Sequence, residues 1–304
     1  MLAARTSRFR FFSPDLKLVF LPGNYCNMFF LILLTIPLPS FGTKDSANNS
    51  YFHPQISKII KNSGLNQNDL GILISEGENP KPYFALNSNK LFIPASITKL
   101  MTSAAVFSDF EPGFKFKTSL WSKANQEGST LQGDLFLVGG GDPTFVSETM
   151  WYLVNAFVRT GIKEIKGNIV VDDSIFDTVR FDESRENVRV DRAYDSPVGG
   201  MSFNWNSINV FIAPNSQEGK AARVYLDPEN SYVKLKGQVL TSKSGSGNKI
   251  VVSRVEDKNF DGDIIQVAGT IAKDEKEIVL FKSVTKPEIW AGSNLKSFLE
   301  QRGI

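Results

Sequence analysis

Apolar and polar residues follow two different patterns along the chain, and the change falls near residue 207. Before it, helical spacing alternates with strand-like runs at 71–75, 83–86, 114–123, 131–138 and 168–172. After it, six short apolar runs follow one another between polar or glycine-rich turns: INVFIAP, RVYL, YVKLKGQVL, KIVVSRV, DIIQVAGTI and EIVLFKSV. Helical spacing resumes only at Ser293–Arg302. The pattern predicts a mixed α and β first part followed by an all-β module.

The first part also carries signals for where its helices begin. After Pro94, apolar residues recur at helical spacing from residue 100 to 106, so Ser96 is expected at a helix N-terminus. A second, amphipathic helix is expected over Ser147–Arg159. The sequence GGGDP at 139–143 lacks the spacing of a phosphate-binding loop, so we expect a tight turn before this helix. Another turn is expected at 78–80, between the first two strands.

The first 42 residues have the composition of a secretory signal peptide. Basic residues precede the nine-residue apolar run Met28–Ile36, and Ser40-Phe41-Gly42 offers small residues at the positions that a signal peptidase recognises. A membrane anchor is the alternative, but Pro37 and Pro39 end the run well short of the 18 or more residues that a span needs. We therefore expect export to the periplasm or cell-wall space, with a signal peptide at 1–42 and a solvated linker at 43–54.

Composition and charge narrow the function classes. The chain has 304 residues, 41% of them hydrophobic, which is ordinary for a globular protein and long enough for two domains. The net charge is +2, and residues 1–42 carry a net +3, which leaves about −1 for the rest of the chain. A body this close to neutral does not match nucleic acid, so no nucleic-acid partner is expected.

Most catalytic chemistries are excluded by the residues that the chain lacks. His53 is the only histidine, which argues against a Ser-His-Asp arrangement and against a histidine-rich metal site. Cys26 is the only cysteine and lies in the predicted leader, so thiol chemistry is not expected in the mature chain. The carboxylates form no pattern typical of a metal site or a glycosidase pair. No metal and no cofactor are expected, and serine activated by lysine remains.

Ser96 and Lys99 have the spacing that this chemistry needs. Residues three apart on a helix share a face, so the Lys99 amine is expected beside the Ser96 hydroxyl. The S-x-x-K pattern alone is weak, because it recurs at residues 231/234, 246/249, 283/286 and 293/296. Only Ser96 combines a helix start with an apolar helix face that could hold the lysine in a dry pocket. The alternative is that Ser96 caps the helix and Lys99 is a solvated side chain.

The segment PASITKL resembles the active-site block of the penicillin-binding proteins. Its surroundings are similar to the DacB-type D-alanyl-D-alanine carboxypeptidase/endopeptidases, which are low-molecular-mass members of that group. The similarity covers most of residues 55–304 through blocks in the family's order: ALNSNKLFIPASITKL, KTSLW, GDLFLVGGGDPTF, KGNIVVDDSIFD and GGMSFNWNSINVFIAP. Several ordered blocks are far more specific than one tetrad.

The resemblance implies a fold of the α/β (α+β) class, a partial serine-transpeptidase/β-lactamase-like domain with an inserted all-β domain. The first part of the transpeptidase-like domain is then expected at 55–200, the insert at 201–286 and a return helix at 287–304. It also implies a serine-type peptidase that cleaves D-Ala-D-Ala in peptidoglycan stem peptides, with Ser96 as nucleophile and Lys99 as general base. β-Lactams would acylate the same serine, and peripheral association with the membrane is left open.

The sequence departs from the family in two later motifs, S-x-N and K-T-G. Residues 202–204 and 207–209 imitate the first and 243–245 the second, but they are expected to be structural turns and strand starts. By family order the functional motifs would follow Gly303, so the chain is expected to be an N-terminal portion of the enzyme. A catalytically inactive wall-associated binding protein or fragment is the alternative function. An esterase or β-lactamase of the same Ser-Lys architecture fits less well, because those enzymes do not resemble the block from Gly199 to Pro214.

Overall fold

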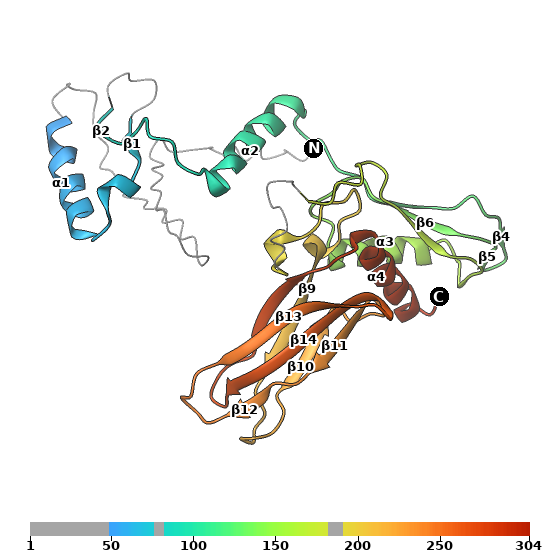
Figure 1. Ribbon diagram of the computed structural model, residues 1–304. Helices are drawn as coiled ribbons and strands as arrows, with labels where there is room; N and C mark the ends of the chain where they lie inside the picture. Colours follow the sequence, from blue (N-terminus) through green and yellow to red (C-terminus); the bar gives the residue numbers. More distant parts are fainter. Residues whose placement is uncertain (1–48, 76–81, 182–190) are drawn as a thin grey trace, which may run out of the picture. The chain divides into compact units, whose positions relative to one another are not determined.

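The computed structural model describes residues 49–75, 82–181 and 191–304, which form two compact units, Met1–Glu111 and Pro112–Ile304 (Figure 1). The predicted signal peptide at 1–42 and the predicted turn at 78–80 lie outside the described residues. Among the helices of the described ranges, none is both long and apolar enough to cross a bilayer.

The first unit combines a helix with a small antiparallel sheet. Its elements are α1 (Asn49–Asn62), β1 (Ile72–Ile74), β2 (Phe84–Leu86) and α2 (Thr98–Asp109). Strands β1 and β2 pair antiparallel, and Ile60 of α1 joins Leu70, Ile72 and Phe84 in a small buried core. Residues 49–54, predicted as the end of a linker, are the first part of α1, and Ile56, which follows them in α1, packs against this core. Apolar contacts further along the helix thus support its start.

The second unit begins with short strands and one helix. Its first elements are β3 (Ser119–Trp121), β4 (Gln126–Glu127), β5 (Thr130–Leu131), β6 (Leu135–Val138), α3 (Ser147–Val158), β7 (Glu164–Ile165) and β8 (Ile169–Asp172). They make two three-stranded sheets, β3-β6-β8 and β4-β5-β7, in which β6 and β8 are parallel. The last helix, α4 (Pro287–Gln301), packs on β8 and contacts α3. This layer therefore contains elements from both ends of the unit.

The all-β module predicted after residue 207 is present. Its strands are β9 (Ser207–Ala213), β10 (Arg223–Asp227), β11 (Val233–Gly237), β12 (Leu240–Ser242), β13 (Lys249–Asp257), β14 (Phe260–Ala272) and β15 (Ile278–Ser283). One sheet has the order β10-β9-β15, and in the other β14 pairs with β11, β12 and β13. The run YVKLKGQVL forms two strands because Gly237 has φ +88°, and a Cβ there would lie 2.1 Å from the Val267 carbonyl oxygen.

In the second unit, one hydrophobic core joins the helical layer to the β module. Trp290 of α4 is fully buried and its indole Nε1–H donates to the Phe203 carbonyl oxygen at 3.1 Å. Its ring lies 6.1 Å from the ring of Phe203, before β9, and 6.0 Å from that of Tyr232, directly before β11. The predicted mixed α/β class is confirmed, with the β module packed on its neighbours through aromatic side chains.

Candidate functional site

Ser96 and Lys99 lie together at the start of α2. A short 3-10 turn, Ala95–Ile97, leads directly into the helix, and the Ile97 N–H donates to the Pro94 carbonyl at 3.0 Å. The Lys99 Nζ donates to the Ser96 Oγ at 2.9 Å, which is within the range for direct proton transfer. The three-residue spacing therefore brings the hydroxyl and the amine together through local helical geometry.

The backbone immediately before the serine is unusual. Ala95 has φ +44°, a left-handed conformation that costs an L-residue roughly 1–2 kcal/mol. Ser96 lies inside the 3-10 turn, and its side chain makes no capping hydrogen bond at the start of α2. The capping part of the alternative for Ser96 is therefore not what the structure shows, because Ile97 is the N-cap of α2 and the Ser96 hydroxyl accepts from Lys99. The other part of that alternative agrees with the structure, in which Lys99 is exposed.

The dry pocket expected around the lysine is not formed by the described residues of the first unit. Ser96 and Lys99 are both exposed, and α2 has no buried residue. Leu100 and Met101 next to the pair are 59% and 73% exposed. An apolar helix face creates a dry site only where other elements cover it, so the dry pocket around Lys99 stays a prediction.

Four residues of the other S-x-x-K matches have different partners. Ser283 Oγ accepts from Arg254 at 2.8 Å, and Lys286 pairs with an aspartate of the β13–β14 region. Ser246 Oγ donates to the Lys243 carbonyl at 2.7 Å, and Lys296 approaches Glu300 one turn along α4 at 3.8 Å. Side-chain contacts thus favour Ser96 and Lys99 over these other matches.

The imitations of later family motifs have structural contacts. Asn204 Oδ1 accepts from the Ser147 backbone N–H at 2.9 Å, and its Nδ2 donates to the Ser147 Oγ at 2.9 Å, so Asn204 caps helix α3. Residues 204–206 form a turn with positive φ throughout. Gly245 lies in the turn between β12 and β13, and its N–H donates to Asp274 at 2.9 Å. These contacts agree with the structural roles predicted for 202–204 and 243–245.

The glycine-rich sequence 139–143 is a closely packed turn, as predicted. A Cβ on Gly139 would lie 2.5 Å from the Gly200 carbonyl oxygen, and one on Gly140 would lie 2.1 Å from that of Lys117. Gly141 has φ +72°. Glycine is needed here because three chain segments approach one another at backbone distance.

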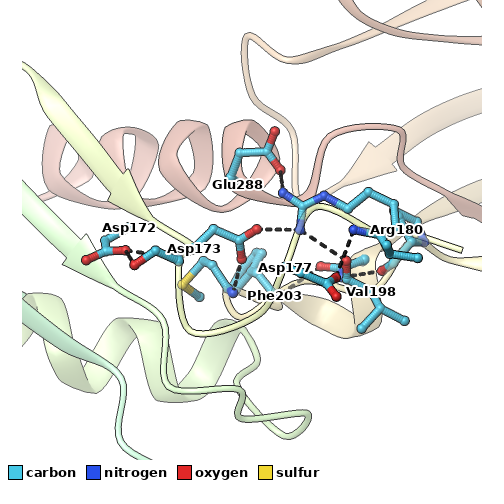
Figure 2. A network of polar contacts seen from close by, with 12 residues as sticks. Asp172, Asp173, Asp177, Arg180, Val198, Phe203 and Glu288 are labelled. Atoms are coloured by element: carbon cyan, nitrogen blue, oxygen red, sulfur yellow. Dashed lines mark hydrogen bonds and ion pairs between the residues drawn. The ribbon is translucent and has the colours of Figure 1, made fainter.

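An aspartate–arginine network, which sequence reasoning missed, lies next to this turn (Figure 2). Asp173, directly after β8, pairs with Arg180 and accepts from the Met201 backbone N–H. Arg180 also donates to the Val198 carbonyl at 3.1 Å and to Glu288 of α4 at 3.2 Å. The network joins the end of β8, the segment leading to β9 and the first turn of α4. Its members are far apart in sequence, and the Asp172-Asp173 doublet at a strand end was the only signal for it.

Comparison with known proteins finds one family over most of the chain. The profile described as the D-Ala-D-Ala carboxypeptidase 3 (S13) family matches residues 52–304. The chain is 24% identical over 287 residues to the "D-alanyl-D-alanine carboxypeptidase" of Actinomadura sp. (strain R39), covering 90% of this chain and 52% of that protein. It is 24% identical over 280 residues to the "D-alanyl-D-alanine carboxypeptidase DacB" of Haemophilus influenzae, covering 90% of this chain and 54% of that protein.

Solved structures give the same result for the fold. The chain matches the crystal structure of penicillin binding protein 4 (dacB) from Haemophilus influenzae with a TM-score of 0.59 at 22% identity, covering 74% of this chain and 49% of that one. A complex of that protein with a novel β-lactam matches with a TM-score of 0.53 at 23% identity, covering 79% and 48%. The chain therefore has the fold of part of a serine penicillin-binding protein, and it spans about half the length of these relatives.

Proposed function

The chain belongs to the D-Ala-D-Ala carboxypeptidase 3 (S13) family, and we propose that it carries the nucleophile and base of an exported serine-type D-Ala-D-Ala carboxypeptidase or endopeptidase. The substrate is the D-Ala-D-Ala end of a peptidoglycan stem peptide. The observation that supports this proposal is the 2.9 Å hydrogen bond between Lys99 Nζ and Ser96 Oγ in the family's S-x-x-K position. The left-handed Ala95 before the serine adds support, because backbone strain concentrates at reactive sites.

Ser96 and Lys99 can together carry out both acylation and deacylation. In the base role Lys99 is a neutral amine, so the hydrogen bond reverses and the Ser96 hydroxyl donates its proton to Nζ as Oγ attacks the penultimate D-Ala carbonyl carbon. The tetrahedral intermediate then expels the terminal D-Ala, whose amine nitrogen takes the proton from Lys99. Water next attacks the Ser96 ester while Lys99 accepts a proton from it, and that proton returns to Oγ as the ester bond breaks. A β-lactam carbonyl would acylate Ser96 in the same way.

The domain organisation forms part of the proposal. Residues 55–200 would be the first part of the transpeptidase-like domain, 201–286 the β insert and 287–304 a return helix. The unit boundary between Glu111 and Pro112 separates the element that carries the reactive pair from the elements that follow.

Covalent labelling tests the nucleophile directly. Fluorescent penicillin should label the full chain, and the label should be lost in Ser96→Ala. Ser103→Ala is a matched control, because Ser103 is an exposed serine on the same helix whose Oγ donates to the Lys99 carbonyl at 2.8 Å. Labelling should persist in this control. A label that survives Ser96→Ala would contradict the assignment.

A wall-binding protein without turnover is the second candidate function. The exposure of Ser96 and Lys99 favours it, because an amine in water is a poor general base. In that case the chain would be retained on insoluble peptidoglycan while penicillin labelling and D-Ala release both fail. Release of D-Ala by the wild-type chain would exclude this candidate.

A further inference from the structure

A cavity lies at one end of the sheet β3-β6-β8, entirely within the second unit. Its volume is about 420 Å³, within the range of small-molecule sites. The ends of three strands lie side by side here. Ser119, the first residue of β3, pairs with Val138, the last residue of β6, and Val138 pairs with Asp172, the last residue of β8. The carboxyl ends of parallel strands are where open α/β sheets most often bind ligands.

One wall of the cavity is the segment 114–117, with the sequence Phe-Lys-Phe-Lys. The rings of Phe114 and Phe116 meet edge to face at 5.2 Å and are 52% and 44% exposed. Two neighbouring, partly exposed aromatic side chains give this part of the cavity an apolar surface that a ring-shaped ligand could contact. The Lys117 backbone lies close to the residues after β6, because a Cβ on Gly140 would lie 2.1 Å from the Lys117 carbonyl oxygen.

The opposite wall presents a fixed carboxylate. Asp172 Oδ1 accepts from the Ser174 Oγ at 2.6 Å and from the Ser174 N–H at 3.0 Å, and these bonds hold the pKa of Asp172 below its ordinary value. The next residue, Asp173, pairs with Arg180 and accepts from the Met201 N–H (Figure 2), and these contacts also restrain the end of β8. Asp172 is therefore ionised at neutral pH and restrained in position.

We propose that this cavity, lined only by residues of the second unit, is a second binding site, for the saccharide–peptide repeat of peptidoglycan. This ligand rests on the function proposed above. The phenyl rings would lie against the apolar face of a pyranose. The Asp172 carboxylate would accept a hydrogen bond from a sugar hydroxyl or an amide N–H, and Lys115 would form an ion pair with a carboxylate of the stem peptide. A phosphate-rich ligand fits poorly, because the Asp172 carboxylate lines the same cavity.

Equilibrium binding of a soluble disaccharide–tetrapeptide to the full chain tests the proposal. The measurements use Ser96→Ala to prevent turnover, with calorimetry as the readout. We expect Phe114→Ala/Phe116→Ala and Lys115→Glu/Lys117→Glu each to weaken binding about tenfold, which corresponds to roughly 1.4 kcal/mol. Exposed residues of the β module provide matched controls, Phe281→Ala for the aromatic change and Lys243→Glu/Lys273→Glu for the charge reversal. The controls should bind like the parent.

The ligand's two parts give separate readouts. Neutral chitotetraose should lose affinity with the phenylalanine variant and keep it with the lysine variant, whereas the free stem peptide should show the reverse. Unchanged binding by both cavity variants, with unchanged melting temperatures, would overturn the proposal. Equal losses in the β-module controls would also overturn it, because they would indicate non-specific attraction.

Penicillin labelling of the same variants in a Ser96 background separates the two proposals. We expect the cavity variants to be labelled normally. If the cavity substitutions do not change ligand binding but penicillin labelling is normal, the proposed second site is wrong and the catalytic assignment stands. If the cavity substitutions weaken ligand binding but penicillin does not label the chain, the second site stands and the catalytic assignment is wrong.

Discussion

The two units of the chain differ in how they use their apolar residues. In the first, the described buried core consists of Ile60, Leu70, Ile72 and Phe84, and α2 contributes no buried side chain. In the second, one continuous core joins sheets and helices around residues such as Trp290 and Leu137. The serine and lysine proposed for chemistry are thus placed by a local helical turn, whereas the proposed second site is placed by long-range packing.

The largest predicted effect concerns Lys99 in the first unit, and it should lower the rate of acylation without changing stability. Lys99→Ala removes the base, so we expect penicillin acylation of Ser96 to slow by ~10²–10⁴-fold. Lys99→Arg should be equally slow, because a guanidinium stays protonated and cannot accept the serine proton. Stopped-flow labelling measures the rate, and Lys58→Ala, an exposed lysine on α1, is the control. The melting temperature should not change, and unfolding of Lys99→Ala would instead indicate a packing role.

The next effect should come from the second unit and should concern stability only. Trp290→Ala empties a fully buried site and removes the donor to the Phe203 carbonyl, so we expect unfolding to become easier by about 3–5 kcal/mol. Denaturant titration followed by circular dichroism measures this loss. Trp121→Ala, at a tryptophan that is 59% exposed on β3, should cost far less. Equal losses in the two variants would contradict the central position of Trp290.

The smallest effect should be on the exposed face of α2. Phe107 is 84% exposed, so Phe107→Ser should change the free energy of unfolding of the chain by no more than about 0.5 kcal/mol. The same denaturant titration applies. A loss as large as that of Trp290→Ala would show that this face is packed in solution, and the contrast between the units would then disappear.

The β module was predictable because its signal is local. Period-two alternation between polar turns places the strands within a few residues of those observed, and DIIQVAGTI lies inside β14. Gly237 divides one predicted run into β11 and β12, because the close approach of Val267 there is a contact between distant residues. Register and pairing order in the module likewise depend on long-range contacts.

The start of α4 was less predictable from apolar spacing, although the family resemblance implied a return helix at 287–304. The helix begins at Pro287, six residues before the periodic stretch at Ser293. Proline is well suited to the first helical position, but Gly292 interrupts the apolar spacing. A Cβ at Gly292 would lie 2.9 Å from Val171 Cγ2, so the glycine serves close packing on β8. The predicted strand at 114–123 was also too long, since only Ser119–Trp121 pairs with β6.

For the candidate site, the sequence predicted the pair but not its surroundings. The contact between Ser96 and Lys99 follows from their spacing on one helix. The cover around Lys99 depends on other elements, so an apolar stripe on α2 could not predict it. The network of Asp173, Arg180 and Glu288 joins residues up to 108 positions apart, and sequence spacing carries no signal for such contacts.

The cap on α3 has a consequence for the order in which the nascent chain can fold. The backbone N–H of Ser147 is satisfied by Asn204, which lies 57 residues later. Helix α3 therefore leaves the ribosome without this acceptor and gains it only after the turn at 204–206 has been synthesised. The helical layer can therefore complete its native contacts only when the start of the β module is present. The ribosome must synthesise the turn at 204–206 before this part of the domain can finish folding.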